Sequence, residues 1–269
     1  MTLQQVERAD VRVPVGLILP AVVGLALLVL PLVGLAARVP WSRLGQILTS
    51  PDVLSALRLS LTTAATTTVV CLVCGVPLAW LLARSELPGR TLLRGLVTVP
   101  LVLPPVIGGV ALLVTFGRRG LVGEWLYETF GVSLPFTTAA VVMAQSFVAM
   151  PFLVVAVEGA LRTADRRFED VAATLGASGW TTFRRITLPA VTPGVVAGAV
   201  LCWARALGEF GATITFAGSY PGTTRTMPVA AYAAINAGEV DTAIALSLLM
   251  IVVSVTILVA LRDRWVRGA

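Results

Sequence analysis

Few residues in this 269-residue chain could carry out chemistry. All 20 of its basic residues are Arg, and it contains neither Lys nor His. It therefore lacks a P-loop lysine, a Schiff-base lysine and an imidazole base. Cys71 and Cys74 form a CxxC pair, but they lie in a charge-free apolar run without other soft ligands. The sequence predicts no catalytic residue, no metal site and no cofactor.

One pair of opposite charges interrupts an apolar stretch near the C-terminal end. Arg205 and Glu209 are four residues apart, so on a helix they would share a face and could neutralise each other. A charge at the centre of a bilayer costs about 3 kcal/mol. Two roles stay open. In the first, the pair fixes helix packing. In the second, Arg205 faces the pathway of a transported anion, and Glu209 weakens its charge, because an unpartnered cation would bind the anion too tightly to release it.

A cluster of helix-breaking residues interrupts another apolar stretch. Pro100, Pro104 and Pro105 are followed directly by Gly108 and Gly109. Such a break is tolerated at membrane depth where it lines a cavity or packs against protein. The cluster is a candidate helix break or gate.

The longest polar segment of the chain, residues 162–189, predicts a compact helix-turn-helix. Asp165 or Thr163 can cap a first helix, and Gly176 ends that helix. A second short helix follows over residues 181–186. The alternative is an ordinary amphipathic loop that lies on the lipid headgroups.

Two acidic residues and one proline define this segment further. Glu169 and Asp170 fall in the first turns of the first helix, where negative charge complements the helix dipole. Pro189 can start the next long helix, because the first turn does not need its missing N–H group.

The elements that must position these residues are membrane helices. The chain is 57% hydrophobic and 13% charged, with a mean hydropathy of +0.91, whereas soluble domains carry about 25% charged residues. Its net charge of +6 comes from arginines that flank apolar segments. That distribution favours a lipid bilayer, and not nucleic acid, as the partner.

Six apolar stretches are long enough to cross a bilayer, which takes about 20 helical residues. The sequence therefore predicts an all-α polytopic membrane protein with six transmembrane helices in a single domain, residues 1–269. The first stretch is longer than the core of a signal peptide, so it is predicted to be retained. The predicted helices are about 13–37, 59–83, 95–117, 136–161, 190–217 and 242–262.

The arginine distribution predicts the orientation. With both termini in the cytoplasm, thirteen arginines lie inside and six outside, as the positive-inside rule requires. The outside segment 118–135 contains GEWLYETFG, which suits a short interfacial helix. The outside segment 218–241 either dips into the bilayer or packs as a short helix.

The polar segment resembles the EAA loop of permease subunits of ABC importers. The family pattern is Glu-Ala-Ala, three residues, Gly, nine residues, Ile, one residue and Leu-Pro. Asp170 stands at the usual Glu and Val171 at the first Ala, while Glu169 adds a neighbouring negative charge. The residues that match the pattern are Ala172, Gly176, Ile186, Leu188 and Pro189. The resemblance implies a loop that docks on an ATPase subunit.

The resemblance extends from about residue 54 to the C-terminus and implies a type I ABC importer-like permease. The stretches VPLVLPPVIGG and ARALGEFGATITFAGSYPGTTRTMPVAAY look like the oxyanion branch, and ATITFAG with RTMPVAAY looks closer to molybdate than to sulfate permeases. The resemblance implies a second copy of the chain, two ATP-binding subunits that hydrolyse ATP, and an extracytoplasmic oxyanion-binding protein. The chain itself would be no enzyme and would lie in the cell membrane.

Three alternatives remain on the sequence. A sulfate/thiosulfate or tungstate ABC permease would share the same branch. A secondary transporter coupled to an ion gradient commonly shows repeats and ionisable groups near the midplane, and would leave the EAA-like loop unexplained. A membrane enzyme would lack evident catalytic residues.

Overall fold

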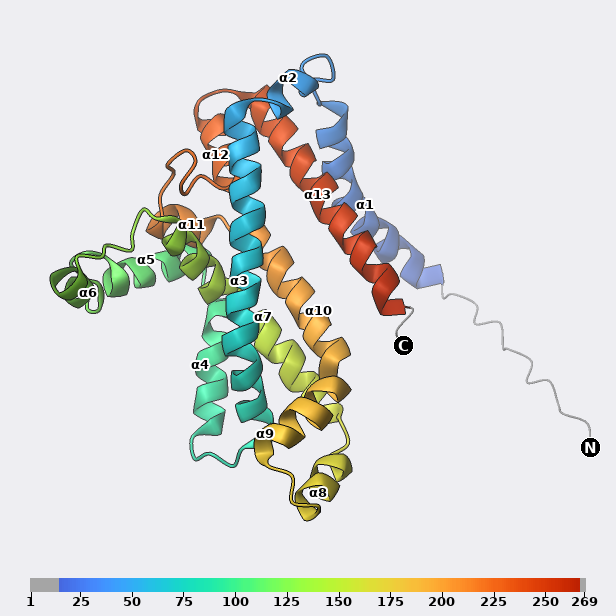
Figure 1. Cartoon of the computed structure of the whole chain (residues 1–269). Coiled ribbons are helices and arrows are strands. Elements are labelled where there is room, and N and C mark those ends of the chain that lie inside the picture. Colours follow the sequence, from blue (N-terminus) through green and yellow to red (C-terminus); the bar gives the residue numbers. More distant parts are fainter. Residues whose placement is uncertain (1–14, 267–269) are drawn as a thin grey trace, which may run out of the picture.

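The computed structural model describes residues 15–266, which form helices joined by short loops, with no strand among them (Figure 1). The predicted all-α fold is confirmed. Apolar stretches take this form because a bilayer offers no hydrogen-bond partners, so backbone N–H and C=O groups must bond within each helix. The predicted start of the first helix at residue 13 lies outside the described residues.

Five described helices are long and apolar enough to cross a bilayer, and a bent pair can supply a sixth crossing. The predicted multi-pass class is confirmed. The long helices are α1 (Val15–Ala37), α3 (Pro51–Arg84), α7 (Thr138–Thr163), α10 (Leu188–Leu207) and α13 (Val240–Val266).

Short helices fill the connections. Residues 123–130 and 227–236 are helical, within the two outside segments where the sequence allowed short helices. The short elements are α2 (Leu44–Leu48), α6 (Gly123–Phe130), α8 (Arg167–Thr174), α9 (Gly179–Thr182), the π-helical turn η1 (Phe183–Thr187), α11 (Gly211–Phe216) and α12 (Met227–Asn236).

The centre of the bundle is the packing of α3, α7 and α10, which contribute most of the largest buried cluster. Small residues allow these helices to approach closely, as is usual between membrane helices. A Cβ atom on Gly194 of α10 would lie 2.3 Å from the Cβ of Ala160 of α7. A Cβ atom on Gly198 would lie 3.0 Å from Leu153 Cδ1. Larger side chains here would separate α10 from α7.

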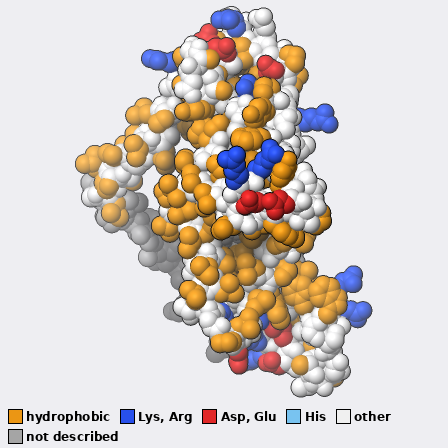
Figure 2. Space-filling view, turned by 90° about the vertical axis from the view of Figure 1, so that its left-hand side faces the viewer, with side chains coloured by type: hydrophobic (Ala, Val, Ile, Leu, Met, Phe, Trp, Pro, Cys, Tyr) orange, Lys and Arg blue, Asp and Glu red, His pale blue; other side chains and the backbone are white. Residues whose placement is uncertain are grey.

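The first helix, α1, lies apart from this centre beside α13 (Figure 1). Its most apolar window contains no buried residue. Figure 2 shows hydrophobic side chains over much of the height of another face of the molecule. A helix that is apolar all round needs cover from lipid or protein, so these surfaces suit a membrane.

The third predicted helix, 95–117, is not continuous. The structure has α4 (Arg90–Val102) and α5 (Pro105–Phe116), bent by 116° at the break. Leu103 and Pro104 each precede a proline and adopt extended backbone, with ψ of 129° and 131°. A residue before proline avoids the helical region, so two in succession turn the chain sharply. Pro100 lies inside α4 and does not break it.

The fifth predicted helix, 190–217, differs at both ends. It ends at Leu207, and α11 follows after a break at residues 208–210. At its start, α9 and η1 run on into α10, so Pro189 lies inside a continuous helical stretch from Gly179. The wide π turn, in which the Leu188 N–H bonds to the Phe183 carbonyl, directly precedes the proline. Such turns accommodate an interrupted hydrogen-bond ladder.

Candidate coupling surface and pathway residues

The start and end of α8 are set by local side-chain and backbone chemistry. The N-cap position of α8 is Arg166, and neither Asp165 nor Thr163 occupies it. The Asp165 carboxylate, one residue earlier, accepts a hydrogen bond from the Arg167 N–H at 3.0 Å and so supports the helix start. At the other end Gly176 has a φ of +79°. The Ala177 N–H bonds to the Ala172 carbonyl and the Gly176 N–H to the Ala173 carbonyl, each at 3.0 Å. These two bonds form a Schellman motif, which favours glycine at this position.

One side of α8 presents apolar side chains to the outside. Phe168, Val171 and Leu175 are 66%, 57% and 82% exposed, and their spacing places them on neighbouring parts of the helix surface. Ala172 is the buried residue of this helix. Clustered exposed apolar side chains mark contact sites for protein or membrane. The α8 surface, defined by Phe168, Val171 and Leu175, is therefore a candidate docking surface.

The two neighbouring carboxylates of α8 have different surroundings. Glu169 Oε1 accepts hydrogen bonds from Arg84 Nη2 at 3.2 Å and from Thr187 Oγ1 at 2.9 Å. Asp170 is exposed and forms no ion pair with another described residue. Sequence reasoning missed Arg84 and Thr187, because contacts across 85 and 18 residues leave no local pattern. The position of Arg84 at the end of a predicted helix was the available signal.

The other residues of the EAA-like pattern belong to the second arm of the loop. Ile186 is half-buried, and Leu188 packs against the largest buried cluster. Pro189 is exposed on the continuous helix. Of these residues Leu188 attaches the loop to the bundle, whereas Asp170 and the α8 surface face outward.

The charged pair in the fifth span is formed in the structure. Arg205 Nη2 lies 2.5 Å from Glu209 Oε2, although Oε2 has no contact with hydrogen-bond geometry. Glu209 Oε1 accepts the Ala212 N–H at 2.8 Å. Arg205 lies in the last turn of α10 and Glu209 just before α11, so each charge complements a helix end. The pair thus spans the break between α10 and α11.

The two helix breaks lie side by side. A Cβ atom on Gly211 of α11 would lie 3.0 Å from Pro105 Cβ, and one on Gly109 of α5 would lie 2.7 Å from Thr215 Cβ. A Cβ atom on Gly108 would lie 2.9 Å from Phe147 Cε1 of α7. The candidate gate is therefore a close junction of α5, α7 and α11. Only the tertiary structure brings Pro104 and Pro105 to the break that follows α10.

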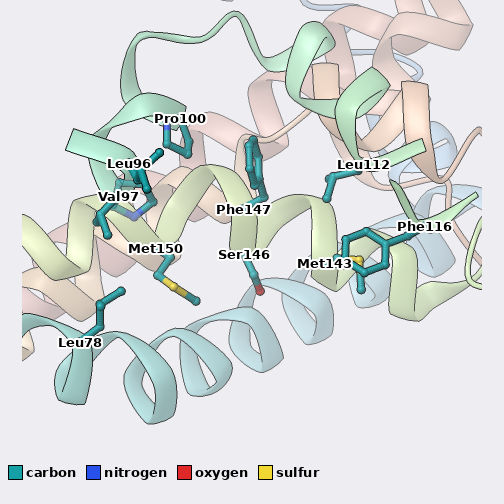
Figure 3. A pocket seen from close by; sticks show the side chains of 11 residues that line it. Leu78, Leu96, Val97, Pro100, Leu112, Phe116, Met143, Ser146, Phe147 and Met150 are labelled. Atoms are coloured by element: carbon teal, nitrogen blue, oxygen red, sulfur yellow. The ribbon is translucent and has the colours of Figure 1, made fainter. Parts of the chain in front are cut away.

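An open cavity of about 340 Å³ lies inside the α4–α5 bend, along α7 (Figure 3). Its lining contains one hydroxyl, that of Ser146, and no ionisable side chain. An anion would find no cation there, so this cavity is a poor oxyanion site. The lining residues are Leu78, Leu96, Val97, Pro100, Leu112, Phe116, Met143, Ser146, Phe147, Met150 and Pro151.

A second buried ion-pair group was missed by sequence reasoning. Glu158 of α7 is 8% exposed at its side chain and accepts Arg94 Nη2 at 2.6 Å and Nε at 2.9 Å. Arg162 Nη2 lies 3.1 Å from the same oxygen. Glu158 and Arg94 served only as span boundaries in the sequence, because their contact spans 64 residues.

The described residues form a multi-span helical bundle in which two helix breaks adjoin and one loop helix presents apolar side chains outward. Residues 75–268 match the family described as the binding-protein-dependent transport system inner membrane component. The chain belongs to this family.

Curated relatives carry more specific names. The Mycobacterium tuberculosis molybdenum transport system permease protein ModB is 52% identical over 91% of this chain and 92% of its own length. The Escherichia coli ModB is 46% identical over 71% of this chain and 82% of its own length. The Escherichia coli sulfate transport system permease protein CysT is 36% identical over 72% of this chain and 70% of its own length.

A solved structure agrees in fold. A chain of a bacterial ABC transporter that imports the acidic polysaccharide alginate superposes with a TM-score of 0.76, covering 94% of each chain at 18% identity. The predicted importer-like permease fold is confirmed.

Proposed function

We propose that this chain is the membrane permease subunit of an ATP-driven importer that moves molybdate into the cell. The substrate assignment rests on one observation: the chain is more similar in sequence to molybdenum permeases than to a sulfate permease. Identity is 52% over nearly the whole chain to a molybdenum permease and 36% over a shorter stretch to a sulfate permease. Sulfate and molybdate are both tetrahedral dianions, so their permeases can share a branch and differ in detail.

The features of the loop that contains α8 support the part of the proposal in which a partner subunit supplies the energy. The α8 surface is apolar and exposed, and Asp170 beside it is free of ion pairs with described residues. In this proposal α8 is the coupling helix, which docks in a groove of an ATP-binding subunit. The apolar side chains fill the groove, and Asp170 meets a basic or backbone donor on that subunit. ATP hydrolysis then belongs to the partner.

The proposed assembly is symmetric. Two copies of the chain form one pathway, two ATP-binding subunits bind at the cytoplasmic α8 end, and an oxyanion-binding protein delivers substrate at the opposite end. Both termini lie in the cytoplasm, as the arginine distribution favours. In this arrangement the Arg205–Glu209 pair and the junction at Pro104, Pro105 and Gly108 lie along or beside the pathway.

Uptake measurements test the substrate. Deleting the gene should reduce uptake of labelled molybdate at trace concentration, with sulfate uptake affected less, and a plasmid copy should restore it. Competition with unlabelled tungstate measures how far molybdate and tungstate are taken up by the same transporter. Normal molybdate uptake, or an equal loss of sulfate uptake, would reject molybdate and favour the sulfate alternative.

A further inference from the structure

We propose that Glu169, Arg84 and Thr187 form a positioning cluster that transmits movement of α8 to the ends of α3 and α10. The inference rests on the proposed function, in which α8 is displaced by an ATP-binding subunit. It assigns Glu169 a different task from that of its neighbour Asp170. Asp170 meets the partner, whereas Glu169 holds the coupling helix to the membrane bundle.

One carboxylate oxygen joins three elements. Glu169 Oε1 on α8 accepts from Arg84 Nη2 at 3.2 Å and from Thr187 Oγ1 at 2.9 Å. Arg84 is the last residue of α3, and Thr187 is the last residue of the π turn that leads into α10. A displacement of α8 therefore acts directly on two helices of the central packing.

The cluster is largely shielded from water. The Arg84 side chain is 6% exposed and that of Glu169 is 20% exposed. Arg84 Nε is buried and has no hydrogen-bond partner among the described residues. A shielded ion pair is less screened than a surface pair and holds a more definite geometry. The position of the guanidinium thus depends strongly on Glu169.

Neighbouring backbone contacts reinforce this attachment. Arg166 Nη2 donates to the Ala83 carbonyl at 3.1 Å, and Arg84 Nη2 lies 3.5 Å from the Ala164 carbonyl. The end of α3 is thus tied to the chain segment that enters α8. Ala172 is the one residue of α8 itself that is buried. Apolar packing therefore holds α8 weakly, and the polar cluster supplies much of the attachment.

The test uses the full complex in liposomes with its ATP-binding subunit and binding protein, and molybdate as the probe. Glu169→Gln removes the charge at nearly constant shape. Molybdate transported per ATP hydrolysed should fall at least about fivefold, the lower end for coupling between sites. Pull-down of the ATP-binding subunit should stay within about twofold of wild type, because the α8 surface is unchanged.

Two further variants separate transmission from stability. Removing Glu169 alone leaves a buried unpaired guanidinium, which destabilises a protein. The double variant Glu169→Gln/Arg84→Gln relieves that charge and should recover folded yield, yet stay uncoupled. Recovery of transport per ATP in the double variant would overturn the proposal. Arg94→Gln is the matched control, because Glu158 keeps Arg162 as its partner, and it should keep wild-type coupling.

A readout without substrate keeps the inference separate from the molybdate assignment. Spin labels at the exposed positions Glu86 and Thr174 report the distance from the end of α3 to α8 in the permease. Wild type should give one narrow distance distribution, and the double variant a broad one. Unchanged distributions would overturn the positioning role. If the double variant gives a broadened distance distribution but the wild-type complex transports no molybdate, the substrate assignment is rejected and the positioning role of the cluster is retained.

Discussion

Gly176 offers a quantitative test of the coupling loop. Its φ of +79° places it in the left-handed region, where a residue with a Cβ atom costs roughly 1–2 kcal/mol. A Cβ atom there would meet nothing within 4 Å in this chain. Strain from the backbone, and not a clash inside the chain, is therefore the expected effect. One to two kcal/mol lowers the population of the native turn about 5- to 30-fold relative to alternatives.

Three substitutions divide this effect into its parts. Gly176→Asn should lose least, because Asn tolerates the left-handed region. Gly176→Ala should carry the strain alone, and Gly176→Leu should add any clash with the groove of the ATP-binding subunit. The assay is ATP hydrolysis stimulated by the binding protein in liposomes, with pull-down of the ATP-binding subunit alongside. We expect stimulation to fall in the order Asn, Ala, Leu, while insertion into the membrane stays normal.

The outcomes discriminate between the two causes. Equal and steep losses in all three variants would mean that the partner requires a bare backbone at this position, and the strain argument would be wrong. Full stimulation in Gly176→Leu would remove the main support for α8 as a coupling helix.

Three further predictions address topology and packing. Single cysteines at Ser178 and Thr223, in a background without the natural cysteines, should label from opposite sides of the membrane; reaction from one side would reject the proposed topology. Arg205→Ala or Glu209→Ala alone should lower the melting temperature in detergent more than the double substitution does, because each leaves one charge of the pair without its partner. The larger loss is expected for Arg205→Ala, since the Glu209 side chain is 1% exposed and breaking a buried pair costs about 3–5 kcal/mol; strict additivity would mean that the two do not interact. Gly109→Val should cost about 1–3 kcal/mol by overpacking, since its Cβ would lie 2.7 Å from Thr215 Cβ; an unchanged melting temperature would contradict the close packing of α5 and α11.

Which residues of the loop face outward depended on helix rotation and contacts. The sequence placed Glu169 and Asp170 together as candidate contacts for a partner. On α8 they are about 100° apart, and only Glu169 reaches Arg84 and Thr187. The roles of these residues in coupling remain predictions. Their different surroundings could not be read from the sequence, because Arg84 is distant along the chain.

The sequence by itself determined the membrane class, the helical content and the places where helices weaken. Charge-free apolar runs must form helices in a bilayer, and prolines disfavour helical backbone in the residues before them. These are local effects. The tertiary structure decided how each weak point was used: Pro100 stays within α4, whereas Leu103 and Pro104 turn the chain by 116°. The tertiary structure also placed the break after α10 beside the start of α5. Close packing at glycines depends on which helices meet, and the fold of the whole chain decides which helices meet.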